Sequence, residues 1–206
     1  AACIARFHHS LPALHPTPSE WCASLEEQIA QNERALLAYP QHLQNDLVHR
    51  LMLAQRSFLR AHAAWIDTRI QQGKMVEAHG DLRAEHVFIS NGVGAIDCLE
   101  FSAALRQLDC ADEIGFLALD CERLAGAAEA QQLLQAYWQI SADDPPTALV
   151  NFYQSLRAAV RARLAILHLA EASVRPSSEW IARARQWLTL ADQHAAGFCS
   201  TYSLII

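Results

Sequence analysis

The sequence has almost no lysine, few glycines and no long apolar run. Lysine occurs once, at position 74, and 16 Lys and Arg residues against 22 Asp and Glu residues give a formal charge of −6. Phosphate backbones are bound by clustered Lys and Arg, so we expect no nucleic-acid partner. No apolar run approaches the roughly 20 residues that a membrane span needs, so we expect no membrane partner.

The cysteines are scattered and show no metal or redox motif. There are six of them, and no two stand in Cys-x-x-Cys spacing. This pattern is typical of free thiols in a reducing compartment. We therefore interpret them as buried free thiols and expect a cytoplasmic protein. The six are Cys3, Cys22, Cys98, Cys110, Cys121 and Cys199.

The composition favours a helical domain. Of the 206 residues, 52% are hydrophobic and 18% are charged, which is typical of a globular protein of one domain. Alanine, leucine and glutamine dominate and β-branched residues are sparse, so helix is the preferred state. We expect an α+β fold that is predominantly α-helical, with one β-hairpin, in a single domain over residues 1–206. Because the chain opens at Ala1 without an initiating methionine, we also expect a piece of a larger gene product.

Prolines, glycines and capping residues mark where helices begin and end. Thr17-Pro18 is typical of a helix start, Gly73 of a helix stop and Asp109 of an N-cap. The helices that we expect cover residues 2–10, 18–38, 43–72, 110–124, 127–140, 147–173 and 177–196.

The histidines of the first half do not form a metal motif. His8 and His9 are adjacent, so their side chains point in different directions on a helix. No other histidine there has a partner at the spacing of metal ligands. We interpret these residues as surface or capping histidines.

A β-hairpin is predicted from Val87 to Asp97. Its arms are rich in β-branched residues, and Asn91-Gly92 between them tolerates positive φ at both central positions of a turn. The two ends of a hairpin lie side by side. We therefore expect Asp81 and His86, which precede the first strand, to lie close to Asp97 at the end of the second.

The same stretch resembles the catalytic and metal-binding segment of the aminoglycoside phosphotransferase family, which has the protein-kinase-like fold. That family carries His-Gly-Asp, four residues, Asn, and then a hairpin that ends in Ile-Asp. This chain reads HGDLRAEH at 79–86 and AID at 95–97. The similarity continues through the Asp-rich helix start at 108–117. The resemblance implies the C-terminal lobe of a kinase-like fold, with ATP and Mg²⁺ as cofactors and a small molecule as substrate.

The resemblance also implies roles for individual side chains. In a kinase-like site one Asp orients the attacking hydroxyl and another holds Mg²⁺ against the nucleotide phosphates. Asp81 matches the first and Asp97 the second. His79 is expected to hold the loop by hydrogen bonding, with Asp112 as a candidate partner.

Two further acids are candidates near this site. Glu100 closely follows Asp97, which suits a position that supports Asp97 or faces the substrate. Asp109, like Asp112, is either a functional residue or one that starts a helix.

His86 departs from the family pattern, because the family has Asn at this position. An amide oxygen is a hard ligand suited to Mg²⁺, whereas imidazole prefers softer metals, which introduces Mn²⁺ as an alternative ion. Three alternatives stay open. His86 ligates a metal weakly, or it hydrogen bonds to Asp81 while the site works with one ion, or the site is catalytically degenerate.

The nucleotide-clamping lobe of a kinase is absent from these residues. Such a lobe needs a glycine-rich loop and a strand lysine. The first glycine is Gly73 and the lysine is Lys74, shortly before His79, so neither can serve. We expect the C-terminal lobe alone, inactive until a missing segment completes it.

Three functions remain as hypotheses. The first is an ATP-dependent phosphotransferase for a hydroxyl of an aminoglycoside-like compound, a sugar or another metabolite. The second is a kinase-like binding module that has lost catalysis. The third is a metal-dependent hydrolase that uses His79, Asp81, His86 and Asp97.

Overall fold

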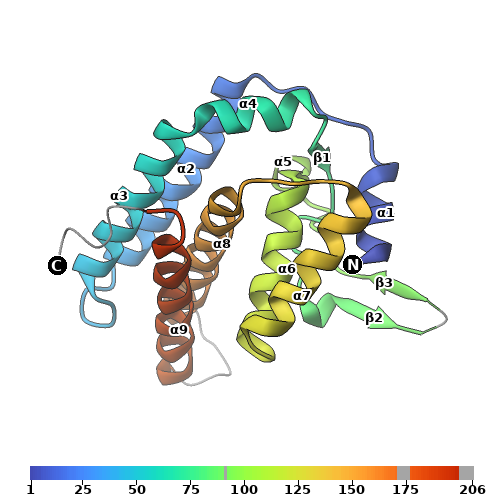
Figure 1. Cartoon of the computed structure of the whole chain (residues 1–206). Helices are drawn as coiled ribbons and strands as arrows, with labels where there is room; N and C mark the ends of the chain where they lie inside the picture. Colours follow the sequence, from blue (N-terminus) through green and yellow to red (C-terminus); the bar gives the residue numbers. More distant parts are fainter. Residues whose placement is uncertain (91, 171–176, 200–206) are drawn as a thin grey trace. The chain divides into compact units, whose positions relative to one another are not determined.

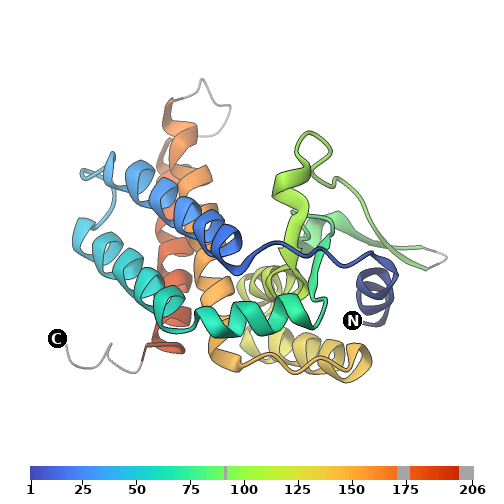
Figure 2. The same ribbon diagram turned by 90° about the horizontal axis from the view of Figure 1, so that it is seen from above.

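The structure is a computed structural model that describes residues 1–90, 92–170 and 177–199. These residues form an α+β protein that is mostly helical and contains two small sheets. They divide into two compact units (Figures 1 and 2). Unit 1 comprises 1–17 and 65–146, and unit 2 comprises 18–64 and the described residues from 147 onward. The single domain expected over 1–206 stays a prediction.

Unit 2 is built from helices. α8 and α9 lie side by side, and α2 packs on α3 and α8. Its core includes the rings of Phe58, Phe152 and Phe198, whose centroids are 4.9 to 5.9 Å apart. The elements are α2 (Pro18–Leu37), α3 (Asn45–Ala61), α8 (Thr147–Leu167), the 3-10 turn η2 (His168–Ala170) and α9 (Ser177–Ala196).

Unit 1 carries every residue that we predicted for the site. α6 and α7 pack against each other, and α1 packs on α7. The elements of this unit, with α4 beginning just before it, are α1 (Ala2–Ser10), α4 (Ala63–Gln71), β1 (Met75–Glu77), the 3-10 turn η1 (Ala84–His86), β2 (Val87–Ile89), β3 (Val93–Ala95), α5 (Ala103–Arg106), β4 (Gln107–Asp109), α6 (Cys110–Leu124) and α7 (Ala127–Ser141).

Two antiparallel strand pairs lead into and out of the predicted catalytic loop. β1 pairs with β4, and Val76 lies opposite Leu108. β2 pairs with β3, and Phe88 lies opposite Gly94. Figure 1 shows this hairpin extending away from α6 and α7. β1 therefore delivers the chain to the loop, and β2 carries it away.

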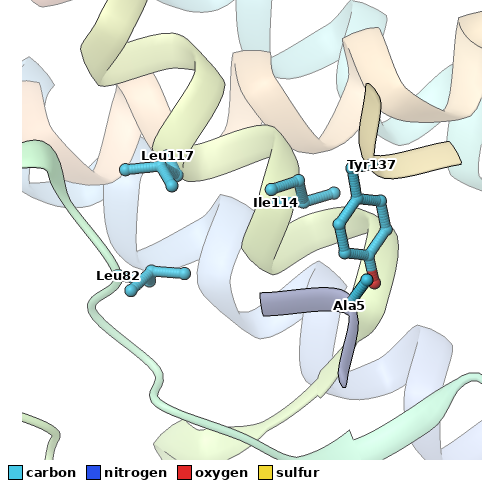
Figure 3. Close-up of a cluster of buried hydrophobic side chains, with 5 residues drawn as sticks. All are labelled: Ala5, Leu82, Ile114, Leu117 and Tyr137. Carbon is cyan, nitrogen blue, oxygen red and sulfur yellow. The ribbon is translucent and has the colours of Figure 1, made fainter. Parts of the chain in front are cut away.

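The loop is anchored in a hydrophobic cluster drawn from three helices. Leu82 of the loop joins Ile114 and Leu117 of α6, Ala5 of α1 and Tyr137 of α7 (Figure 3). Burying one large aliphatic side chain contributes roughly 1.5–3 kcal/mol. Packing of Leu82 therefore ties the loop to α6 and to the helices that flank it.

Most of the predicted elements are confirmed. The helices expected over 2–10, 110–124 and 177–196 have those bounds, and Gly73 follows α4 with φ +66°. The hairpin is confirmed, although the turn residue Asn91 lies outside the described residues. Among the helices of the described ranges, none has both the length and the apolarity that crossing a membrane requires.

Two predictions of secondary structure are wrong. The helix expected over 43–72 is two helices, because α3 ends at Ala61 and the C-cap residue His62 has φ −120° and ψ 25°, which are not helical. No Pro or Gly lies at this break, so no local signal marks it. The expectation of a single hairpin missed the β1–β4 pair, whose strands are too short to show alternation.

The end of the helix expected over 147–173 also differs. α8 ends at Leu167 and is followed by the 3-10 turn η2, and residues 171–173 lie outside the described residues.

The cysteines are free thiols, as predicted, but most of them are not buried. Cys110 is buried, Cys98 is exposed and the other four are half-buried. Cys98 follows the hairpin in a segment where several neighbouring side chains are also exposed, which explains its exposure.

Candidate active site

The loop after β1 makes a tight turn at Gly80. This residue has φ +86°, and a Cβ there would lie 2.9 Å from the carbonyl oxygen of Leu105 and 3.1 Å from Cδ1 of Leu99. Both the dihedral and the close approach require glycine. Gly80 therefore sets the direction of the chain between His79 and Asp81.

Two buried carboxylates of α6 hold the two ends of the loop. Glu113 Oε1 accepts the backbone N–H groups of His79 at 2.9 Å and Gly80 at 2.7 Å. Asp120 Oδ2 accepts the N–H of Ala84 at 3.0 Å. Glu113 and Asp120 lie about two helical turns apart, so they share one face of the helix. α6 therefore supplies the hydrogen-bond acceptors that hold both ends of the loop.

Glu113 and Asp120 were not among the residues predicted from the sequence. Asp112 was the predicted candidate partner of His79, whereas the carboxylate that accepts the His79 amide is Glu113. The available signal was a pair of acids at helical spacing inside an otherwise apolar helix. Acids that lie on the buried side of a helix need partners, and backbone N–H groups of a loop supply them.

The imidazole of His79 joins the loop to the end of the hairpin. Its Nε2 lies 2.8 Å from the carbonyl oxygen of Ile96, and its Nδ1 lies 3.4 Å from the amide nitrogen of Asp81. A carbonyl only accepts and an amide N–H only donates, so the ring is neutral with its proton on Nε2. Both nitrogens are engaged with backbone groups, which is the loop-holding contact expected of His79.

The imidazole of His86 lies between the two predicted acids. Its Nδ1 donates to the carbonyl oxygen of Asp81 at 2.8 Å, and its Nε2 accepts from Arg83 Nη2 at 2.8 Å. The carboxylate oxygen Asp81 Oδ2 is 3.8 Å from Nδ1, and Asp97 Oδ2 is 3.4 Å from Nε2. The hairpin thus brings Asp81 and Asp97 to one side chain.

Arg83 is a member of this cluster that the sequence analysis missed. Its Nε and Nη2 lie 3.0 and 2.9 Å from Asp81 Oδ2, and its Nη1 contacts Glu85. The guanidinium therefore neutralises Asp81 and covers the lone pair of His86. A long side chain with several rotamers gives no sign in the sequence of where its charge will lie.

The oxygen and nitrogen atoms fit one hard cation better than two. Asp97 has φ 65°, a conformation that Asp tolerates, and its side chain is 77% exposed. Its carboxylate suits Mg²⁺. The atoms that would hold a second ion, Asp81 Oδ2 and His86 Nε2, both accept from Arg83. Of the three alternatives for His86, its hydrogen bond to Asp81 is present, through the main-chain carbonyl.

The described residues show no preformed metal centre of either the kinase type or the hydrolase type. Among them, no group of three or more His, Cys, Asp and Glu side chains is arranged to hold a metal ion. His79 and His86 stack with ring centroids 5.9 Å apart, and both nitrogens of His79 are engaged with the backbone.

The remaining predicted acids lie on other segments of unit 1. Glu100 is exposed on the segment after the hairpin, and Asp112 is buried in the first turn of α6. Asp109 is fully buried, caps α6 by accepting the Ala111 N–H at 2.8 Å, and pairs with Arg69.

Arg69 sits between two buried carboxylates, Asp109 at the start of α6 and Asp143 shortly after α7. It donates to Asp109 at 2.6 Å and to Asp143 at 2.9 Å. Burial alone would lower the pKa of Arg69, but the charges and hydrogen bonds of Asp109 and Asp143 outweigh it and raise that pKa. The neighbouring Cys110 has its pKa raised to about 12 by burial and by Asp109. This ion triad fixes the start of α6.

An apolar cavity of about 400 Å³ opens beside the loop within unit 1. It lies between α1 and the hairpin, and its volume is in the range of small-molecule sites. The wall includes Ile4, Phe7, His79, Leu82, Val93 and Cys98.

Similar proteins occur in mycobacteria. The chain is 33% identical over 150 residues to an uncharacterized protein of Mycobacterium bovis and to uncharacterized proteins of two Mycobacterium tuberculosis strains. The match covers 72% of this chain and 29% of each relative, so the chain spans less than a third of the length of the curated relatives that it matches. No protein-family model and no solved structure matches the chain.

Proposed function

We propose that the complete protein is an ATP-dependent phosphotransferase that acts on a hydroxyl of an aminoglycoside-like compound, a sugar or another small metabolite. The observation that carries the proposal is the meeting of Asp81 and Asp97 at His86, at 3.8 and 3.4 Å. Phosphoryl transfer depends mainly on positioning and on neutralising charge. A rigidly held acid beside an exposed acid is suited to both tasks.

Asp81 is suited to orient the acceptor hydroxyl. Its amide is held by His79 and its carbonyl by His86, while its side chain is 21% exposed. A carboxylate fixed in this way can accept a hydrogen bond from the hydroxyl that attacks the phosphoryl group. The same geometry lets the base keep its direction without help from the substrate.

Asp97 is suited to the nucleotide-borne cation. Its side chain projects from the strand end and is 77% exposed, so its oxygens are accessible to a hard ion. When bound with ATP, Mg²⁺ would neutralise charge on the phosphates. His79 donates a hydrogen bond to the carbonyl oxygen of Ile96, the residue before Asp97. This hydrogen bond connects the loop to the ion site.

Exposed apolar side chains on the hairpin and on the segment after it support completion by another segment. Apolar side chains exposed on a protein surface can mark interaction sites. We propose that a nucleotide-clamping segment of the complete protein packs on some of them. The exposed side chains are Phe88, Ile89, Val93, Ile96, Phe101 and Leu105.

A second candidate is a kinase-like binding module without catalysis. Arg83 favours it, because its guanidinium already neutralises Asp81 and occupies the lone pair of His86. In this case the protein binds nucleotide but transfers no phosphoryl group. Turnover, and not nucleotide affinity, separates the two functions.

The test measures phosphoryl transfer by the complete protein. ATP, Mg²⁺ and a panel of aminoglycosides, sugars and small hydroxyl metabolites are assayed for nucleotide release and phosphorylated product. We expect Asp81→Asn to lower kcat by roughly 10²-fold or more while ATP still binds. Asp97→Asn should also weaken binding of the Mg²⁺–ATP pair. Asp144→Asn, at an exposed position of the same unit, is the matched control.

Each outcome has a distinct meaning. ATP binding without turnover in every variant favours the binding module. If the complete protein neither binds ATP nor turns it over, the proposal is contradicted.

A further inference from the structure

His8 is buried, although the sequence led us to expect a surface or capping histidine. Its exposed fraction is 5%, whereas its neighbour His9 is exposed. The correction has a physical cause: α1 packs on α7, and the face that carries His8 turns inward with Ala5. A buried imidazole needs partners for both nitrogens.

The partners of His8 lead to the catalytic loop. Its Nε2 lies 2.8 Å from Glu113 Oε2, and its Nδ1 lies 2.6 Å from the hydroxyl of Tyr137. The other oxygen of the same carboxylate, Glu113 Oε1, accepts the amides of His79 and Gly80. A continuous set of hydrogen bonds therefore runs from α7 through α1 and α6 to the residue before Asp81.

The direction of these hydrogen bonds follows from the chemistry of the groups. An ionised carboxylate only accepts, so His8 Nε2 carries a proton and donates to Glu113. Burial raises the pKa of the Tyr137 hydroxyl, which therefore stays protonated and donates to His8 Nδ1. Tyr137 thus fixes the tautomer of His8, and His8 fixes the second oxygen of Glu113.

Removing His8 would change more than packing. Glu113 is 1% exposed, so the loss of its partner would leave a buried carboxylate oxygen without the donor that it has now. A buried acceptor without a donor is costly, and the side chain would shift or take up a proton. Either change disturbs the bonds that hold His79 and Gly80, and with them the direction of Asp81.

We propose that His8 is a positioning residue for Asp81 that acts through Glu113, with Tyr137 holding its ring. The expected effect of His8 on catalysis rests on the proposed function. Its expected effect on the loop rests on the hydrogen bonds alone. α1 would thus act on the site through hydrogen bonds and not by direct contact with Asp81 or Asp97.

A cavity next to His8 makes a sharp experiment available. It has a volume of about 620 Å³, and its wall includes Arg6, His8, Lys74, Tyr137 and Asp143. Free imidazole is small enough to enter through it and occupy the space left in a His8→Ala variant. Imidazole can donate to Glu113 and accept from Tyr137, whereas neutral 1-methylimidazole has no N–H to donate.

The experiment uses the complete protein and two independent measurements. Amide hydrogen exchange of His79 and Gly80 reports the loop directly, and kcat with KM reports the reaction. For His8→Ala we expect exchange at both amides to speed up at least tenfold and kcat to fall at least tenfold. KM for ATP should stay within twofold, because His8 touches no substrate in this geometry. Imidazole should restore both readouts, and 1-methylimidazole should restore neither.

Two further variants keep the result decisive. Tyr137→Phe keeps the ring and removes only the hydroxyl, so it should show a weaker form of the same effect even where His8→Ala folds poorly. His9→Ala, on the exposed side of α1, should change neither readout. Equal loss in His9→Ala and His8→Ala, or unchanged exchange at His79 and Gly80 in His8→Ala and Tyr137→Phe, overturns the inference.

The inference and the proposed function fail in different ways. If the complete protein has no phosphotransferase activity but amide exchange is faster in His8→Ala, the proposed function is contradicted and the role of the hydrogen bonds from His8 to the loop is not. If the protein is active and His8→Ala alters neither exchange nor kcat, only the role of these hydrogen bonds is contradicted.

Discussion

Arg83 donates to Asp81 Oδ2 through Nε at 3.0 Å and through Nη2 at 2.9 Å. The Nη2 group of the same guanidinium also donates to His86 Nε2. A positive charge thus sits where a second divalent cation would find its oxygen and nitrogen ligands. The side chain pairs with the carboxylate of Asp81 and competes with any metal at His86.

Replacing Arg83 should therefore open the second metal position. In Arg83→Gln we expect Mn²⁺ to bind roughly fivefold more tightly, the equivalent of about 1 kcal/mol of charge repulsion between close, solvated charges. Titration calorimetry of the complete protein without nucleotide measures this. Mn²⁺ is the better probe than Mg²⁺, because imidazole accepts it more readily.

Arg34→Gln is the matched control, since Arg34 forms an exposed pair with Glu27 in unit 2. Adding His86→Leu to Arg83→Gln should abolish the gain in affinity. Unchanged Mn²⁺ binding in Arg83→Gln would show that the guanidinium does not compete for the site.

The hairpin and the N-cap of α6 were predictable because their signals are local. Asn91-Gly92 between β-branched arms indicates a hairpin, and Asp109 before an apolar helical pattern indicates a cap. Both predictions need only a few consecutive residues, and the structure confirms both. The proximity of Asp81 and Asp97 then follows from the hairpin itself.

The support of the loop was not predictable, because it depends on residues far apart in the sequence. His8 and Glu113 are separated by 105 positions, and periodicity alone cannot show that α1 turns one histidine inward and leaves its neighbour exposed. The position of Arg83 is a rotamer choice made among three acceptors. Such choices are decided by tertiary packing, which a single sequence does not display.

Gly80 should tolerate no side chain. Gly80→Ala places a Cβ 2.9 Å from the Leu105 carbonyl oxygen at φ +86°, where non-glycine residues are strained. We expect a loss of about 1–3 kcal/mol in the free energy of unfolding, measured by urea denaturation. Gly92→Ala is the control, because a Cβ at Gly92 meets nothing within 4 Å. Equal stability of the two variants would show that the turn can relax.

Arg69 should be among the most sensitive positions of unit 1. Arg69→Met leaves Asp109 and Asp143 buried together without the guanidinium between them, and breaking a buried ion pair on one side costs about 3–5 kcal/mol. Urea denaturation gives the change in the free energy of unfolding. Arg34→Met, which removes an exposed ion pair, should cost less than about 1 kcal/mol. A change of similar size in both variants would contradict a structural role for the triad.

The pKa of Cys110 predicts which thiols react. Burial raises the pKa of Cys110 from 9.0 to about 12, so its thiol stays protonated in the folded protein at pH values where an unfolded chain would ionise it. The contribution of this group to stability is therefore complete below pH 9 and declines as the pH rises toward 12.

At pH 8 we expect iodoacetamide to modify exposed Cys98 first and to leave Cys110 unmodified until the protein unfolds, with mass spectrometry locating each adduct. Because Cys98 adjoins Asp97, Mg²⁺ with ATP should slow its modification in the complete protein, and Cys98→Ser should remove the fast reaction. Early modification of native Cys110 would show that the start of α6 opens far more readily than its buried contacts imply.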